Sequence, residues 1–201
     1  MSVRTWRKAA AACVAAAVIG VVFASCSGGT NAVDQNAGGE FRYVQATAKG
    51  SLIATKDRKK AGNVVAQLLT GSGKYSLSQD AGKVVVMNYF ASWCPPCQTE
   101  TPQFDAVYRE RKSSNIAFIG VDAKDSPRGK AQSWVQDKGV SFPVIYDPNA
   151  KSALQLGNVP IVTLPATVLI DKAGRVAAVY QSPLLPNDLN PMLDKLLAET
   201  A

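Results

Sequence analysis

VVVMNYFASWCPPC, residues 84–97, joins an apolar run to two closely spaced cysteines. The run is rich in β-branched and aromatic side chains and Gly82 precedes it, which is the pattern of a buried parallel strand. After Cys97, the residues Phe104, Val107 and Tyr108 recur at helical spacing among polar neighbours. The two cysteines therefore fall where a strand ends and a helix begins.

This junction favours thiol chemistry. The first turn of a helix offers unpaired N–H groups and the positive end of the macrodipole, and both stabilise a thiolate. Cys94 is expected at an exposed lip, as the nucleophile. Cys97 lies one turn further in and can reach back to close a disulfide. An inert structural disulfide is the alternative, although structural bridges seldom span two residues at a helix start.

Histidine is absent from the 201 residues, which contain four cysteines. This composition excludes a Cys/His protease, a zinc site of two Cys and two His, and haem attachment through Cys-x-x-Cys-His. Two cysteines alone do not fill a tetrahedral zinc site, so we expect no metal and no cofactor other than the Cys94–Cys97 disulfide. The length and the 47% hydrophobic fraction fit one domain with appendages.

The formal net charge of +7 does not indicate nucleic-acid binding. Three of the basic residues, Arg4, Arg7 and Lys8, lie in a segment that reads as a signal peptide. The run KDRKK at residues 56–60 is the one concentrated basic stretch, and no aromatic residues interleave with it. We interpret it as a solvated linker or a membrane-proximal patch.

Residues 1–25 have the organisation of a secretory signal, with a basic start, an apolar core from Ala9 to Phe23, and small residues before Cys26. The end resembles the bacterial lipoprotein signal, in which Cys26 would be lipidated and become the mature N-terminus. Phe23 stands where that signal usually has Leu. An uncleaved anchor helix and a plain secretory signal are the alternatives. All three interpretations of this segment place the remainder of the chain outside the cytoplasm.

Residues 26–59 are expected to form a flexible tether, because small and polar residues predominate after Cys26. The folded domain is expected at residues 60–201. Its first part, up to Asp80, predicts a short pair of strands with a turn at residues 71–73.

Strands and helices alternate after the cysteines. Strands are predicted at residues 116–121, 144–146, 166–170 and 175–180, and helices at residues 96–111, 128–138 and 150–156. The last two strands form a hairpin with Gly174 in its turn. A final amphipathic helix carries apolar residues from Leu189 to Leu197, with Asn187 or Asn190 as its cap. This order predicts an α/β sheet with an antiparallel hairpin at its edge.

The chain resembles the thioredoxin superfamily and, within it, the membrane-tethered TlpA/ResA-type thiol-disulfide oxidoreductases. The resemblance covers roughly residues 60–201. It rests on NYFASWCPPC at residues 88–97, on Glu100 and Pro102, and on LPATVLID at residues 164–171 followed by Gly174. It implies a thioredoxin-like fold with a central mixed sheet flanked by helices, an N-terminal strand extension and a helical insertion at residues 123–149.

The resemblance also implies roles for individual residues. Pro165 would be a cis-proline facing the disulfide and would expose the backbone of Leu164 to an extended substrate; Pro160 is the competitor for this assignment. Trp93 would cover the rim, and Pro95 and Pro96 would line it. The remaining two roles concern Cys97. Glu100 would exchange a proton with the Cys97 thiol, or else be a solvated helix glutamate. Asn88 would direct a polar side chain at the same buried thiol and tune it, or else be a packed amide.

The mechanism implied is thiol-disulfide exchange. The Cys94 thiolate attacks a substrate disulfide, and Cys97 resolves the mixed disulfide. Because surroundings outside the membrane are oxidising, a reductant needs electrons from across the membrane, which a polytopic thiol transporter supplies in the resembling proteins. Their best-known substrate is apocytochrome c, whose Cys-x-x-Cys-His must be reduced for haem attachment. We take a protein-disulfide reductant as the leading hypothesis.

Four other functions use the same fold. A disulfide-forming oxidase uses the same residues and stays open, and so does a peptide-binding module without redox turnover. A peroxide-reducing enzyme is disfavoured, because residue 91 is Ala where a Thr-x-x-Cys setting is needed. A copper chaperone is disfavoured by the absence of histidine.

Overall fold

The computed structural model describes residues 44–200. The signal segment, Cys26 and the first part of the expected tether therefore lie outside the described residues. A five-stranded sheet with the strand order β5-β4-β3-β6-β7 organises the chain. Its strands are β3 (Val84–Phe90), β4 (Ile116–Asp122), β5 (Val144–Tyr146), β6 (Ala166–Ile170) and β7 (Val176–Tyr180).

The sheet is mixed. β3, β4 and β5 run parallel, whereas β6 is antiparallel to β3 and β7 is antiparallel to β6. Every residue of β3 and β4 is buried, as the continuous apolar runs predicted. The predicted hairpin with Gly174 in its turn is confirmed, with Gly174 at φ 72°.

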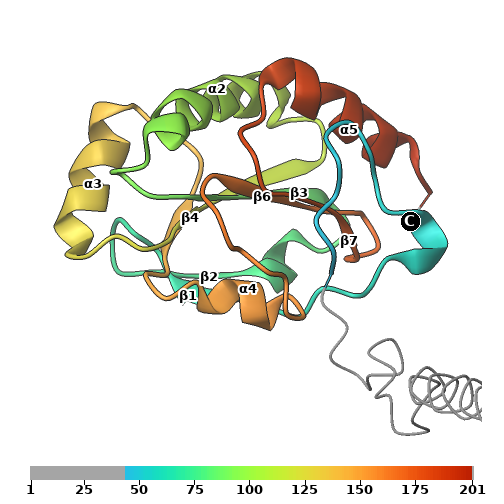
Figure 1. The fold of residues 1–201 in the computed structure, drawn as a ribbon, viewed down its shortest axis with the longest axis horizontal. Coiled ribbons are helices and arrows are strands. Elements are labelled where there is room, and N and C mark those ends of the chain that lie inside the picture. Colours follow the sequence, from blue (N-terminus) through green and yellow to red (C-terminus); the bar gives the residue numbers. More distant parts are fainter. Residues whose placement is uncertain (1–43, 201) are drawn as a thin grey trace, which may run out of the picture. The chain divides into compact units, whose positions relative to one another are not determined.

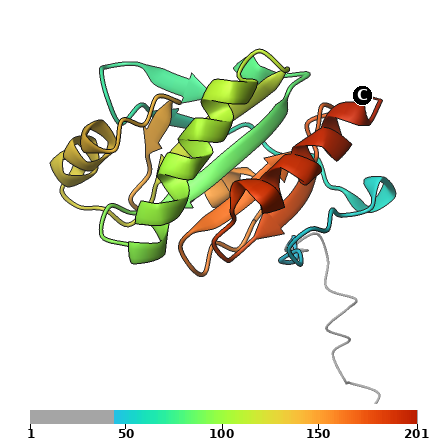
Figure 2. The ribbon, with the colours of Figure 1, turned by 90° about the horizontal axis from the view of Figure 1, so that it is seen from above.

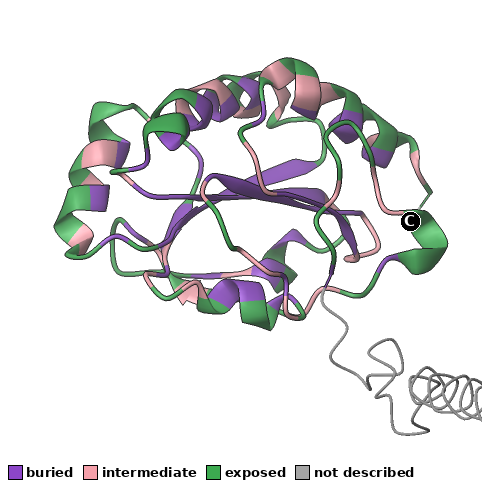
Figure 3. Cartoon of the chain, in the orientation of Figure 1, coloured by how far each residue is buried: buried purple, intermediate pink, exposed green. Residues whose placement is uncertain are grey.

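Helices cover both faces of the sheet (Figure 1). α2 (Pro95–Arg111) and α5 (Pro186–Ala198) lie side by side over one face (Figure 2), and α3 (Arg128–Asp137) lies towards the β5 edge. α4 (Lys151–Gln155) and the hairpin of β1 (Val65–Gln67) and β2 (Lys74–Ser76) cover the other face. Residues 44–200 also contain two short 3-10 helices, η1 (Thr55–Asp57) and η2 (Leu77–Asp80). The buried residues concentrate on the sheet and on the inner faces of the helices (Figure 3).

Alternation along β3 divides the core in two. Val84, Val86 and Phe90 pack into the cluster beneath α2 and α5, whereas Val85, Met87 and Tyr89 pack into the cluster on the α4 side. Asn88 lies between Val86 and Phe90 in this alternation, so its side chain belongs to the face that α2 covers. The register of the sheet thereby directs a polar group towards the helix that carries both cysteines.

Two of the sequence expectations differ from the structure in the N-terminal segment. Residues 44–59, expected as part of a flexible tether, pack along β7, where Thr47 N–H donates to Val179 and Ile53 N–H to Ala177. Arg58, expected in a solvated basic run, is buried, because its guanidinium pairs with Asp171 and Glu199. An edge strand such as β7 has free N–H and C=O groups that such a segment can pair.

The start of α5 also differs. The helix begins at Pro186 after the N-cap Leu185, and neither Asn187 nor Asn190 caps it. Pro is favoured in the first turn, where its missing N–H has no partner to lose. Asp188 accepts a hydrogen bond from Leu185 N–H at 2.9 Å and so satisfies the start of the helix. None of the helices within residues 44–200 is long and apolar enough to cross a membrane.

Candidate active site

Cys94 and Cys97 form a disulfide at the N-terminus of α2, with their Cα atoms 5.3 Å apart. Cys94 is the N-cap residue of α2, and its Sγ accepts a hydrogen bond from Cys97 N–H at 3.3 Å. In a reduced protein the same N–H and the helix dipole would stabilise a thiolate on Cys94. The predicted placement at the strand–helix junction is confirmed by β3 ending at Phe90 and α2 beginning at Pro95.

The disulfide is less accessible than an exposed lip implies. Cys94 is 3% exposed and Cys97 is fully buried. The expectation of an exposed Cys94 is therefore wrong for the disulfide-bonded protein. The physical reason is that Cys94 packs into the core cluster that contains Phe90, Ala91 and Phe104.

The accessible surface beside the disulfide comes from its neighbours. Trp93 is 58% exposed, and Pro95 and Pro96 are also exposed. The indole N–H of Trp93 donates to the carbonyl of Lys124 at 3.2 Å, which ties this large side chain to the loop after β4. An exposed aromatic group beside a reactive disulfide is a contact that an incoming peptide can use.

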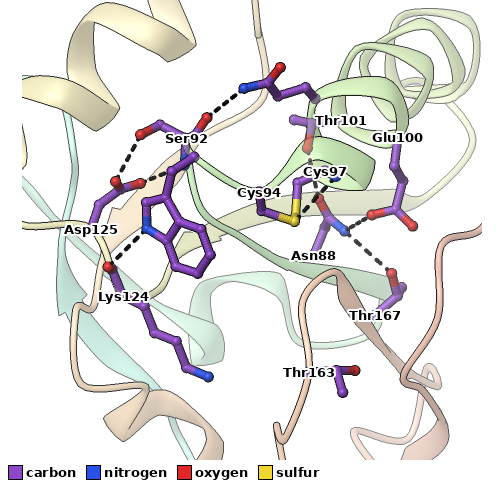
Figure 4. Close-up of a disulfide and its surroundings, with 12 residues drawn as sticks. Asn88, Ser92, Cys94, Cys97, Glu100, Thr101, Lys124, Asp125, Thr163 and Thr167 are labelled. Carbon is purple, nitrogen blue, oxygen red and sulfur yellow. Dashed lines mark hydrogen bonds between the residues drawn. A yellow bond between two sulfur atoms is a disulfide. The ribbon is translucent and has the colours of Figure 1, made fainter.

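The peptide bond between Leu164 and Pro165 is cis, as the resemblance implied, and Pro160 is not preceded by a cis bond. Pro165 directly precedes β6. Thr163, two residues before Pro165, lies across from the disulfide (Figure 4). Its hydroxyl donates to the carbonyl of Gln181 at 3.0 Å, so the loop before β6 is fixed to the segment after β7. The bond between Ser126 and Pro127 is also cis, which the sequence analysis did not predict.

A buried polar network lies beside the disulfide (Figure 4). The side-chain amide of Asn88 donates to Glu100 Oε2 at 2.7 Å and to Thr167 Oγ1 at 3.4 Å. The hydroxyl of Thr101 donates to Asn88 Oδ1 at 3.4 Å. The second oxygen of Glu100 accepts a hydrogen bond from Leu184 N–H at 2.7 Å. Asn88 is thus a satisfied amide within this network.

Glu100 is not a solvated helix glutamate, since it is only 1% exposed. Burial raises the pKa of Glu100 to about 7, although hydrogen bonds from Leu184 and Asn88 and the charge of Lys49 favour the carboxylate. Glu100 follows Cys97 by three residues on α2, so both side chains belong to one face of the helix. A carboxyl group with this pKa can accept or release a proton near neutral pH.

A second carboxylate fixes the segment in front of Cys94. Asp125 accepts hydrogen bonds from Ser92 N–H at 2.6 Å and from the Ser92 hydroxyl at 2.8 Å (Figure 4). The carbonyl of Ser92 in turn accepts from the Gln98 side chain at 2.9 Å. Sequence reasoning missed Asp125, Thr101 and Thr167. The only available signal for Asp125 was its place just after a buried strand, in the sequence DAKD.

The Redoxin family matches residues 54–197 of the chain. The thiol:disulfide interchange protein HelX of Rhodobacter capsulatus is 33% identical over 121 residues, which cover 60% of this chain and 64% of HelX. The thiol-disulfide oxidoreductase ResA of Halalkalibacterium halodurans is 32% identical over 122 residues, which cover 61% of this chain and 66% of ResA. The match spans slightly less than two thirds of the length of both relatives.

Solved structures of thiol-disulfide proteins are also similar to this chain. A secreted thiol-disulfide isomerase from Corynebacterium glutamicum superposes with a TM-score of 0.72 at 29% identity, covering 81% of this chain and all of that structure. A DsbF homologue from Corynebacterium diphtheriae gives 0.69 at 30% identity, with 77% and 100% covered. The expected fold and the ResA-type resemblance are confirmed. The chain belongs to the Redoxin family of the thioredoxin superfamily, and it is related to the ResA, HelX and DsbE thiol-disulfide oxidoreductases.

Proposed function

We propose that this protein is an extracytoplasmic, membrane-anchored thiol-disulfide oxidoreductase that reduces protein disulfides. The observation that carries the proposal is the Cys94–Cys97 disulfide at the start of α2 with the buried Glu100 one turn behind Cys97. The similarity to ResA and HelX supports the same chemistry.

The first step uses the reduced protein. The Cys94 thiolate attacks one sulfur of a substrate disulfide and forms a mixed disulfide, and the other substrate sulfur leaves as a thiolate that takes up a proton. Only an ionised Cys94 is nucleophilic. The Cys97 N–H, which contacts Cys94 Sγ at 3.3 Å, and the α2 dipole favour that ionised state.

The second step releases the substrate. Cys97 loses its proton and attacks Cys94 Sγ, which forms the Cys94–Cys97 disulfide and returns the second substrate sulfur as a thiol. Two electrons thus pass from the protein to the substrate. Glu100 is the proposed acceptor of the Cys97 proton, because its pKa of about 7 leaves much of it ionised at neutral pH. Asn88 orients Glu100 through the 2.7 Å hydrogen bond.

The substrate is proposed to be an extended protein segment that carries a disulfide. Leu164 offers its backbone beside the cis-proline Pro165, and Trp93, Pro95 and Pro96 provide an apolar rim. Backbone pairing with apolar side-chain contacts suits an extended peptide. Among such substrates we propose apocytochrome c, on the strength of the family resemblance.

The proposed location is the outer side of the cell membrane, with Cys26 as a lipidated anchor. The support is the sequence of residues 1–26, which has a basic start, an apolar core and small residues before a cysteine. A reductant in this oxidising compartment needs a supply of electrons, for which we propose a membrane thiol transporter as the partner. Mass spectrometry of the membrane fraction tests the anchor, and an unmodified Cys26 would contradict it.

The reduction potential of the Cys94–Cys97 couple tests the direction of exchange. We expect the full chain, equilibrated with glutathione or dithiothreitol, to give a value near the roughly −270 mV of thioredoxin. A value towards the roughly −120 mV of a strong oxidant would support a disulfide-forming oxidase instead. The similarity to a secreted thiol-disulfide isomerase is the observation that favours disulfide formation as the second candidate function.

A complementation assay tests whether redox turnover is needed at all. Replacing both Cys94 and Cys97 by Ser should abolish function in a strain that depends on this protein. Full function of that double variant would support a peptide-binding module without redox turnover.

A further inference from the structure

Asp122 is a buried acidic residue at the end of β4 that the mechanism above does not use. It lies in register between Phe90 of β3 and Tyr146 of β5, and it is fully buried. Alternation along β4 puts its side chain on the face of Phe118, which is the face that α2 and α5 cover. Asp122 therefore lies at the same end of the sheet as Cys94.

Neither carboxyl oxygen of Asp122 has a hydrogen-bond partner among the groups of residues 44–200. Only one other buried side-chain atom in that part of the chain, Trp134 Nε1, shares this condition. A buried carboxylate without a donor is costly, because it gives up the hydrogen bonds of water and gains none. A carboxylic acid at this place is less costly and brings a donor of its own.

The surroundings of Asp122 are acidic. Asp125 is the neighbouring carboxyl group, but two carboxylates are both acceptors and can pair only when one of them holds a proton; Asp147 adds its negative charge. The nearby cations point elsewhere. Arg128 at the start of α3 donates to the carbonyls of Leu68 and Leu69, and Lys124 is exposed.

The polar side chains of Tyr146 and Asp147 are engaged with other groups. Asp147 accepts from the N–H groups of Lys151 and Ser152. The hydroxyl of Tyr146 donates to the carbonyl of Asp125 at 3.3 Å. Burial first, and then the neighbouring carboxylates of Asp125 and Asp147, raise the pKa of Asp122 to about 8. At neutral pH the acid form is therefore favoured.

Asp125 connects this site to the disulfide. Both of its oxygens accept hydrogen bonds from Ser92, the second residue before Cys94. The carbonyl of the preceding residue, Lys124, accepts a hydrogen bond from the Trp93 indole. The short loop from Asp122 to Asp125 thus fixes both residues that precede the nucleophile.

We propose that Asp122 is a positioning residue that stays protonated at neutral pH and donates a hydrogen bond to Asp125, so that the two carboxyl groups together hold Ser92 and Trp93 in front of Cys94. Loss of the proton at higher pH creates two adjacent buried carboxylates. Their repulsion displaces Asp125 and releases the Ser92–Trp93 segment. The effect on thiol-disulfide exchange rests on the proposed function, whereas the protonation state of Asp122 is independent of it.

The protonation state is tested by carboxyl-carbon NMR of the oxidised full chain in detergent, labelled at aspartate. In this state neither Cys94 nor Cys97 titrates. We expect one aspartate signal with the chemical shift of a protonated acid at about pH 6.5, where ordinary aspartates are ionised. That signal should be absent from Asp122→Asn. If every aspartate of the wild-type protein is ionised at this pH, the proposal is overturned without any variant.

The link to the active site is tested by the indole N–H resonance of Trp93, assigned with Trp93→Phe. We expect it to shift with pH together with the Asp122 signal. Asp122→Asn should lose this transition, because its amide N–H donates to Asp125 at every pH. Asp137→Asn removes an exposed charge from α3 and should keep the transition. A Trp93 transition that persists in Asp122→Asn would contradict the positioning role.

The exchange rate gives a third readout in the reduced protein. Above the Asp122 midpoint, we expect the rate of wild type relative to Asp122→Asn to fall, while Asp137→Asn follows wild type. A constant ratio would overturn the role of Asp122 in exchange. If no variant reduces protein disulfides, the proposed function fails, and the two NMR results still decide the protonation and the link to Trp93.

Discussion

The side-chain amide of Asn88 donates a 2.7 Å hydrogen bond to Glu100 Oε2, and both residues are 1% exposed. The bond joins the central strand of the sheet to the helix that carries the cysteines. Because Leu184 N–H binds the other Glu100 oxygen, the carboxyl group is held from two sides and cannot turn to solvent. This fixed, buried acid gives the site its expected response to pH.

Replacing Glu100 by Gln should slow the resolution of the mixed disulfide. Gln keeps the shape and can still accept a hydrogen bond, but it cannot take the proton of Cys97. We expect a loss of about tenfold or more at neutral pH, within the range for general acid–base groups. Stopped-flow measurement of both exchange steps should show an unchanged attack by Cys94 and a slower second step.

Glu110→Gln is the matched control for this variant. Glu110 is exposed on the same helix, so its replacement should leave both rates unchanged. The wild-type rate should also rise as pH increases through about 7, the pKa of Glu100, and this inflection should vanish in Glu100→Gln. An inflection that survives the substitution would assign it to a cysteine instead.

The same carboxyl group should make stability depend on pH. Its folded pKa of about 7 lies above the unfolded value of roughly 4.3, so the folded state binds the proton more tightly. The resulting stabilisation is fully present below the unfolded pKa and is lost as pH rises through about 7. The shift corresponds to on the order of 4 kcal/mol. Urea unfolding at several pH values should show this decline in wild type and a weaker one in Glu100→Gln; equal slopes would contradict the assignment.

Cys97→Ser should trap the substrate. Cys94 can still attack a substrate disulfide, but no thiol at position 97 resolves the product, so a mixed disulfide accumulates. Cys94→Ser should trap nothing, because Cys97 is fully buried. Non-reducing gel electrophoresis with a disulfide-containing protein separates the two outcomes. Equal trapping by both variants would mean that Cys97 can also act as a nucleophile.

Local patterns were sufficient to predict the central elements of the fold and the position of the cysteines. The apolar run of β3, the helical spacing after Cys97 and the turn at Gly174 each depend on residues close together in the chain, and each is found in the structure. The cis bond before Pro165 was inferred from the family resemblance, since spacing alone does not separate cis from trans proline.

Long-range partners could not be predicted in the same way. Asp125 binds Ser92 across 33 residues, and Glu100 binds Leu184 across 84 residues. No periodicity connects such positions, because folding of the whole sheet brings them together. The burial of Cys94 has the same origin, since it follows from packing against residues of several elements.

The ion pairs of Arg58 are long-range contacts whose contribution to stability can be tested directly. It lies in the segment expected to be a tether, yet its guanidinium contacts Asp171 at 3.0 Å and Glu199 at 2.5 Å. The Arg58 and Asp171 side chains are each 2% exposed, so Arg58→Ala would remove the buried one of the two arginines that pair with Asp171 and leave only Arg175. Removing one partner of a buried pair costs about 3–5 kcal/mol when the remaining charge has no other partner, and the Arg175–Asp171 pair reduces this cost. We expect Arg58→Ala to lower the urea midpoint strongly, whereas Lys59→Ala, which removes the exposed neighbouring charge, should leave it unchanged. Equal midpoints for the two variants would mean that the ion pairs of Arg58 add nothing to the stability of the domain.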